Sequence, residues 1–356
     1  MIVLSFFLLL LALLLLPFVP GMLEVRRKLD AQPLRVVRGY DVNIHHFANR
    51  FRQYIQTHFA EELADMHTPE QKEGGLEDGS RYCLLGTQAV VSFEEAERNT
   101  QVTNRLFIAA QDLNLPGAMT YLNELYASGG IVGADEDIYR ALLAGADIEL
   151  GQNSMVLRWM HAAGEIRAAA GCILYGRVSA DERIVIAAGS RFRRLNARAI
   201  LFGTQAPVSP AAPARHEIKP EELGVKVEVA AGRWLIEDDL TLPDHSRVHA
   251  DLVVVGALTL GKHCEIHGSI KSHQTLHIQA GCAIHGSVVC MQDIRIDAET
   301  RLKGPLVSEA RINLAANCEI GSTTKPTTIS ADEIYIQADC LAHGTVWARS
   351  VGQVDA

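Results

Sequence analysis

Apolar residues recur at a spacing of eighteen over the C-terminal third of the chain. Leu242, Leu260 and Ile278 lie eighteen apart, and the spacing continues to Ile296 and Leu314. Within each repeat, apolar pairs lie two residues apart, which is the period of a strand, and the pairs return every six residues. Each repeat is therefore one coil with three short faces. The pattern predicts a triangular β-solenoid whose coils stack about 4.8 Å apart.

The predicted solenoid core consists of aliphatic side chains and small thiols. Cysteine shares one column with serine and threonine, and we expect it to pack there as a small apolar group. A single coil buries too little to offset the ordering of its backbone, so stability is expected from the stack. The predicted core residues are Leu242, Val248, Leu260, Cys264, Ile266, Ile278, Cys282, Ile284, Ile296, Leu302, Leu314, Cys318 and Ile320.

A fainter series with the same period precedes the main one. Ile148, Ile166 and Ile184 form one of its columns, which predicts a short solenoid block over residues 146–203. Residues 204–239 begin with a stretch rich in Pro and Ala and are expected to form a linker or insert. The main solenoid is then expected over residues 240–351.

Residues 24–145 lack these columns and are expected to form a helical or α+β region. Apolar residues three or four apart from Asn43 to Leu63 predict an amphipathic helix. Two shorter helices are expected near Met119–Ala127 and Glu136–Leu143, and a strand over Leu84–Ser92.

Residues 1–23 predict a single transmembrane helix that anchors the chain. Ile2 to Leu23 carry no charge and are long enough, as a helix, to cross the hydrocarbon core. Basic residues follow, and basic flanks stay on the cytoplasmic side, so the bulk of the chain is expected to face the cytoplasm from the inner membrane. Pro17 and Pro20 leave a kinked or shallow anchor open. The predicted anchor residues are Phe6, Phe7, Leu10, Leu13, Leu16, Arg26, Arg27 and Lys28.

Composition narrows the class of protein. Of 356 residues, 48% are apolar, and 33 Lys and Arg against 42 Asp and Glu give a net charge of −9. A nucleic-acid partner is therefore not expected. The seven cysteines form no CxxC pair, so neither a disulfide framework nor a zinc knuckle is indicated. Reduced thiols agree with a cytoplasmic location.

The chain shows no catalytic motif, and we assign no catalytic, cofactor-binding or metal-binding residue. His249, His267 and His285 form a ladder one coil apart, which in principle suits zinc or copper, but a solvated or assembly-facing stripe is the favoured interpretation. A second group of basic residues is expected on a solvated face or in contact with anionic lipid. These residues are Arg191, Arg193, Arg194 and Arg198.

The His-Gly corners at 267/268, 285/286 and 343/344, with their flanking aliphatic pairs, resemble the bactofilins, the bacterial polymer-forming cytoskeletal proteins. The likeness covers roughly residues 145–351. It implies a right-handed β-helix that self-assembles without nucleotide at the membrane. The resemblance also implies a scaffold for envelope or cell-shape machinery and no enzyme or cofactor. The expected partners are further copies of the chain, membrane lipid, and envelope or cell-wall proteins.

The C-terminal coil is expected to be open, because nothing in the sequence after Val351 provides an obvious cap. An open coil offers unpaired backbone groups to another copy, and Ile336, Val346 and Trp347 are the predicted assembly residues. One alternative is a docking platform in which residues 40–145 bind a partner. The other is a left-handed hexapeptide acyltransferase, which is disfavoured because Leu and Ile often occupy its small-residue positions.

Overall fold

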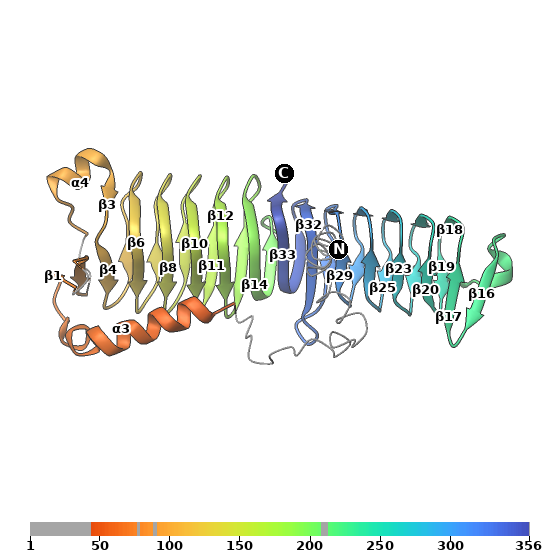
Figure 1. Ribbon diagram of the computed structural model, residues 1–356, viewed down its shortest axis with the longest axis horizontal. Helices are drawn as coiled ribbons and strands as arrows, with labels where there is room; N and C mark the ends of the chain where they lie inside the picture. Colours follow the sequence, from red (N-terminus) through yellow and green to blue (C-terminus); the bar gives the residue numbers. More distant parts are fainter. Residues whose placement is uncertain (1–43, 77–78, 88–90, 208–212, 356) are drawn as a thin grey trace, which may run out of the picture. The chain divides into compact units, whose positions relative to one another are not determined.

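The computed structural model describes residues 44–355 except 77–78, 88–90 and 208–212. The chain is mainly β, with a β-solenoid of about 14 turns and few helices, so the predicted solenoid is confirmed (Figure 1). The predicted anchor, residues 1–23 and the basic residues after it, lies outside the described residues. In the part of the chain that the structure describes, no helix is both long enough and apolar enough to span a bilayer.

The N-terminal block stacks its coils into parallel sheets whose paired residues are mostly 17 or 18 apart in the chain. One row of strands contains β3 (Val102–Thr103), β6 (Thr120–Ala127), β8 (Ile138–Ala144), β10 (Met155–Ala162), β12 (Ile173–Ala180) and β14 (Arg191–Phe202). The second halves of these long strands continue a row that begins with β1 (Gln71–Gly75), β2 (Arg81–Leu85) and β4 (Leu106–Ala109), in which β1 is antiparallel to β2. The third row contains β5 (Leu113–Asn114), β7 (Ile131–Val132), β9 (Ile148–Leu150), β11 (Glu165–Ala168) and β13 (Arg183–Ile186).

The C-terminal block has three rows of parallel strands. Successive coils pair at an interval of 18 residues, and β15 pairs with β19 at an interval of 30. The first row contains β17 (Arg233–Ile236), β20 (Asp251–Val254), β23 (Ile270–Ser272), β26 (Val288–Cys290) and β29 (Leu306–Ser308), with β16 (Val227–Ala230) antiparallel to β17. The second contains β18 (Leu240–Leu242), β21 (Leu258–Leu260), β24 (Leu276–Ile278), β27 (Ile294–Ile296) and β30 (Arg311–Leu314). The third contains β15 (His216–Glu217), β19 (Ser246–Val248), β22 (Glu265–Ile266), β25 (Ala283–Ile284), β28 (Arg301–Leu302) and β31 (Glu319–Ile320). The last coils are made by β32 (Thr327–Ile336) and β33 (Cys340–Val354).

The two blocks meet at their C-terminal ends. β14 is the last strand of the N-terminal block and β33 the last strand of the C-terminal block, and the two pair antiparallel. After β14 the chain passes to the far end of the C-terminal block, whose coils then return toward β14, so β14 and β33 lie side by side (Figure 1). The contact that joins the blocks is therefore strand pairing, interrupted by register shifts between Phe192 and Arg194 and between Ala197 and Ile200.

Each coil turns at one residue with left-handed backbone. His245, His263 and Gly281 occupy this position in successive coils, with φ of 60°, 60° and 73°. The column of small polar residues beside it faces inward: the Cys264 and Cys282 thiols donate to the carbonyls of Pro243 and Gly261, each at 3.2 Å. Ser, Thr and Cys alternate in this column because each supplies a small donor to a turn carbonyl, which is a stricter requirement than small apolar packing.

The helix predicted from Asn43 to Leu63 is confirmed as α3 (His46–Asp65). It covers an outer face of the N-terminal block, where Ile55 and Phe59 are buried against Leu84 and Ile108. The remaining helices among the described residues are the short α4 (Glu95–Thr100) and the 3-10 turn η3 (Pro220–Glu222).

The short helices expected near Met119–Ala127 and Glu136–Leu143 are wrong, since these segments form β6 and β8. Both faces of these strands carry apolar side chains. Tyr126 and Leu143 lie on the outer face under α3, and the alternate residues face the solenoid core. Of the strand expected over Leu84–Ser92, Leu84 and Leu85 belong to β2, and residues 88–90 lie outside the described residues. The coils thus begin well before residue 146, and residues 204–239 hold β15, β16 and β17 rather than a linker alone.

Candidate functional site

The junction between the blocks pairs the last strand of each block, β14 and β33. Leu195 lies opposite Val346 in the antiparallel pair, and both side chains are fully buried. On the outer side, the Asn196 amide donates to the Thr345 hydroxyl at 2.8 Å. The junction thus combines a buried apolar layer with polar bonds across the strands, as an ordinary sheet interior does.

The predicted assembly residues lie at this junction or next to it, but the expected open C-terminal coil is wrong. Val346 and Ile336 are fully buried, and Trp347, which is 44% exposed, lies opposite Arg194 of β14. The physical reason is that the last coil of each block ends in an unpaired strand edge. Two such edges in one chain satisfy each other before a second copy is needed.

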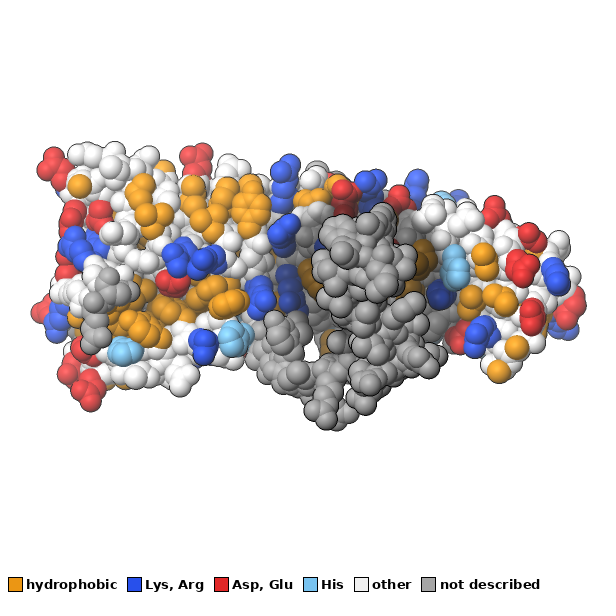
Figure 2. Space-filling view, viewed as in Figure 1, with side chains coloured by type: hydrophobic (Ala, Val, Ile, Leu, Met, Phe, Trp, Pro, Cys, Tyr) orange, Lys and Arg blue, Asp and Glu red, His pale blue; other side chains and the backbone are white. Residues whose placement is uncertain are grey.

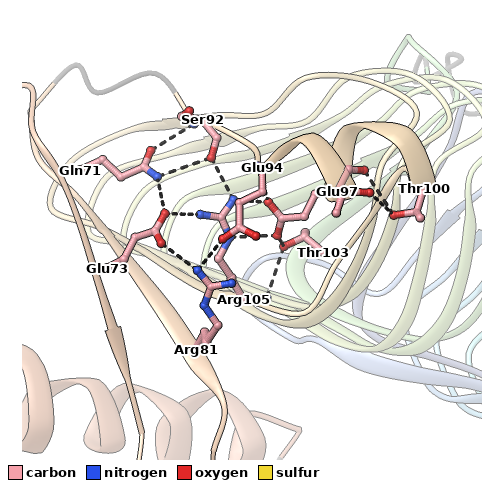
Figure 3. Close-up of polar contacts among 10 residues, drawn as sticks. Gln71, Glu73, Arg81, Ser92, Glu94, Glu97, Thr100, Thr103 and Arg105 are labelled. Atoms are coloured by element: carbon pink, nitrogen blue, oxygen red, sulfur yellow. Dashed lines mark hydrogen bonds and ion pairs between the residues drawn. The ribbon is translucent and has the colours of Figure 1, made fainter.

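The outer end of the N-terminal block is closed by a buried ionic cluster, shown in Figure 3. The Arg105 side chain is fully buried and pairs with Glu97 at 2.5 Å and with Glu73 at 2.7 Å. A further guanidinium N–H donates to the Ser92 carbonyl at 2.9 Å. Burial raises the pKa of Glu97, but hydrogen bonds from Thr103 and Arg105 outweigh it and hold that pKa below its ordinary value. Charged groups that close a coil end oppose pairing with another strand.

The outer end of the C-terminal block is closed differently. The antiparallel hairpin of β16 and β17 replaces a further coil, and Ile218 is buried under the chain that leads to it. Leu223 and Val225 pack against the same core. Within the described residues, the hairpin ends in β16, which pairs with β17 alone and is mostly exposed.

The histidine ladder is a real stack on the outside of the C-terminal block. The rings of His249 and His267 are 4.3 Å apart and nearly parallel, and those of His267 and His285 are 4.5 Å apart. Glu265 lies beside them, with one carboxylate oxygen 3.2 Å from His285 Nε2 and 3.4 Å from His267 Nε2. The other oxygen accepts from Arg215 at 3.1 Å and Arg247 at 3.0 Å.

Glu265 is the electrostatic centre of this face. Burial raises its pKa, but hydrogen bonds from His285 and Arg247 and the charge of Arg215 outweigh burial and bring the pKa to about 2. Burial and the neighbouring His285 lower the pKa of His267. Glu265 is therefore charged at neutral pH, and its charge is balanced by two arginines.

Two groups of described residues have ligand atoms close enough to hold a metal ion. One is Glu265, His267 and His285, and the other is His45, His161 and Asp181. In the first group, the carboxylate already satisfies two guanidinium groups, so a cation there would compete with two positive charges. The charges around Glu265 therefore favour an ion-pair network at this position.

The arm formed by residues 213–217 lies over the third row of the C-terminal block. Arg215 donates to the His263 carbonyl at 2.8 Å and β15 pairs with β19. A cavity of about 250 Å³ opens beside the arm, and its lining includes Glu265, Arg301 and Lys303. Its lining carries both signs of charge, which suits a small polar molecule.

The predicted core residues all lie in the solenoid interior, each at most 3% exposed. Sequence reasoning missed Arg105 and Glu265, which organise the two ionic networks. Arg105 gives no periodic signal because its partners lie on segments outside the coils. Glu265 could have been found, because Arg247 precedes it by one coil and opposite charges one coil apart are neighbours on adjacent strands.

The fold makes this chain a β-solenoid protein. Comparisons with protein-family models, curated proteins and solved structures found no match for it. The class of protein therefore rests on the fold, and the likeness to bactofilins rests on the repeat pattern.

Proposed function

We propose that the chain is a non-enzymatic scaffold of the bactofilin type, a right-handed β-helix held at the inner membrane by residues 1–23 with its bulk in the cytoplasm. It self-assembles through solenoid ends without nucleotide. It positions envelope or cell-shape machinery, and its partners are membrane lipid, further copies and envelope or cell-wall proteins.

The observation that carries this proposal is the antiparallel pairing of β14 with β33. Two solenoid ends meet here through strand pairing, buried apolar side chains and side-chain hydrogen bonds across the strands. Because both ends belong to one chain, assembly must exchange the contact, so that β14 of one copy pairs with β33 of the next. Such an exchange is heterologous and continues from copy to copy unless it closes into a ring.

The connection between the blocks sets the protein concentration at which β14–β33 pairing between two copies competes with the same pairing within one chain. Residues 203–215 tether the two ends, and short tethers give effective concentrations in the millimolar range. The closed single chain is then favoured in dilute solution. Exchange is favoured where copies are crowded, as attachment to a membrane would make them.

Mixed single-cysteine variants test this exchange. One chain carries Asn196→Cys and a differently tagged chain carries Thr345→Cys, and the two are co-expressed in full length. Exchange places the two new thiols opposite each other between chains, so a disulfide joining the two tags is expected under mild oxidation. The seven native cysteines are buried and serve as an internal background.

The matched control replaces Asn196→Cys with Arg158→Cys, an exposed position on β10 two strands away from the junction. That pair is expected to give no mixed disulfide. Equal cross-linking by both pairs, or none from the junction pair at concentrations where sedimentation shows oligomers, would remove the basis for assembly by exchange.

A further inference from the structure

Two arginines stand side by side on the outer face at the junction. Arg177 of β12 and Arg194 of β14 are direct partners in the parallel ladder, so their side chains leave the sheet on the same side, about 4.8 Å apart at the backbone. Figure 2 shows Lys and Arg side chains gathered over β14. Like charges in directly opposed positions destabilise a sheet unless something else compensates them.

Neither guanidinium has a counter-charge among the described residues. Elsewhere in the solenoid, arginines in comparable positions pair with carboxylates, as Arg140 does with Glu124 and Arg311 with Glu333. In addition, the Nε atom of Arg194 is buried and has no hydrogen-bond partner. Burial, and after it the charge of Arg177, lowers the pKa of Arg194. A half-buried pair of positive charges is thus held in place without an anion.

Aromatic side chains hold both guanidinium groups from either side. Arg177 lies over the Phe47 ring at 5.1 Å, and Arg194 lies over the Trp347 ring at 5.3 Å. Both aromatic residues remain exposed, Phe47 at 46% and Trp347 at 44%. Stacking fixes the plane of a guanidinium while it leaves the N–H groups at the edge free to donate.

Polar side chains lie next to the two arginines on the same face of the sheet. Ser179 follows Arg177 by two residues and Asn196 follows Arg194 by two, so all four side chains point to the same side of the sheet. The Asn196 amide is held by Thr345. The Ser179 hydroxyl contacts His161, around which lie the titratable groups His45, Arg52 and Asp181.

We propose that Arg177 and Arg194 form a binding site for a phosphate group, walled by Phe47 and Trp347. Two neighbouring guanidinium groups can donate to the oxygens of a tetrahedral oxyanion and neutralise its charge. A bound anion would offset the repulsion between the two arginines. It would also give the buried Arg194 a hydrogen-bond acceptor. The site spans the two blocks, so its occupant also strengthens the junction. It does not depend on exchange between copies, because the same residues meet in a closed chain.

The phosphate group has two possible sources, a lipid headgroup or a free phosphate, and the test separates them. The full-length chain in nonionic detergent is titrated with inorganic phosphate and with dihexanoyl phosphatidic acid, with dihexanoyl phosphatidylcholine as the zwitterionic control. Heat of binding is recorded together with the tryptophan fluorescence of the chain, to which Trp347, stacked on Arg194, contributes beside Trp159 and Trp234. The variants are Arg177→Gln and Arg194→Gln, and the matched control is Arg158→Gln, an exposed arginine on β10.

The wild-type chain is expected to bind saturably, and each site variant to lose affinity about tenfold or more, as the loss of a charge-assisted pair requires. Arg158→Gln should bind as the wild type does. Equal affinity for both probes supports a free phosphate, and binding of phosphatidic acid alone supports a lipid headgroup. If Arg194→Gln does not fold, the phosphate affinity of the Arg177→Gln variant tests the proposal, because Arg177 is only half-buried. Absence of saturable binding to the wild type, or unchanged affinity in Arg177→Gln, would overturn the proposal.

Discussion

Replacing Arg105 with alanine is expected to open the outer end of the N-terminal block while the remaining coils stay folded. The substitution leaves Glu97, whose side chain is 11% exposed, without the cation that balances it. Glu73 is 37% exposed and loses less. Removing one partner of a buried ion pair costs about 3 to 5 kcal/mol. This cost falls on the terminal coil, because coils contact only their neighbours.

Hydrogen exchange by mass spectrometry measures this local opening. A cost of about 3 to 5 kcal/mol corresponds to a loss of protection of at least a hundredfold in β2 and β4, with β21 and β24 as unaffected reference strands. Arg81→Ala is the matched control, because Arg81 is exposed and shares Glu73 with Arg105. It is expected to change protection little.

The same cluster predicts a pH dependence. The pKa of Glu97 is below its ordinary value in the folded chain, so its contribution to stability is present above about pH 4.3 and is lost as pH falls through the folded pKa. Acid should open β2 and β4 in the wild type, and this pH dependence should be weaker in Arg105→Ala. Equal protection in wild type and Arg105→Ala at neutral pH would refute the assignment of Arg105 as the closing group.

Three further predictions concern the coils and the junction. Glu265→Gln should make the arm at Arg215 accessible to proteolysis. It should also remove a contribution to stability that the wild type loses only as pH falls toward 2. Limited digestion at a series of pH values measures both effects. Gly286→Ala should disrupt its coil, since the added Cβ would lie 2.4 Å from a backbone oxygen. Gly75→Ala, which meets nothing within 4 Å, should be tolerated in the same thermal-unfolding assay. Leu195→Ala should destabilise the junction by about 2 to 5 kcal/mol in urea unfolding, and an unchanged midpoint would show that the buried layer does not hold the blocks together.

The sequence predicts the C-terminal block well because its columns keep a constant interval. Leu258, Leu276 and Ile294 are paired in the structure at the interval of 18 that the sequence shows. In the N-terminal block, Ile138 pairs with Met155 at an interval of 17 and Met155 with Ile173 at 18. One missing residue moves every later side chain out of its column, which hid the earlier coils and made β6 and β8 look like helices.

The junction had no comparable signal in the sequence. Antiparallel pairing of Leu195 with Val346 joins residues that belong to different columns and lie far apart in the chain. The sequence repeat predicts that the last coil of each block has an unpaired strand edge. It does not predict which strand pairs with that edge, because this depends on where the other block ends. The phosphate-site arginines show the same limit, because Arg177 and Arg194 are 17 apart and their aromatic walls come from α3 and β33.

The most direct test of the fold at the junction is a disulfide within one chain. Asn196→Cys and Thr345→Cys together place two thiols on directly opposed residues, whose Cα atoms in an antiparallel pair are about 4.5 to 5.5 Å apart. In dilute solution the double variant should form an intramolecular bond, seen by mass spectrometry of peptides from the monomer. If both new thiols stay reduced under conditions that oxidise accessible cysteine pairs, the two solenoid blocks do not meet as described.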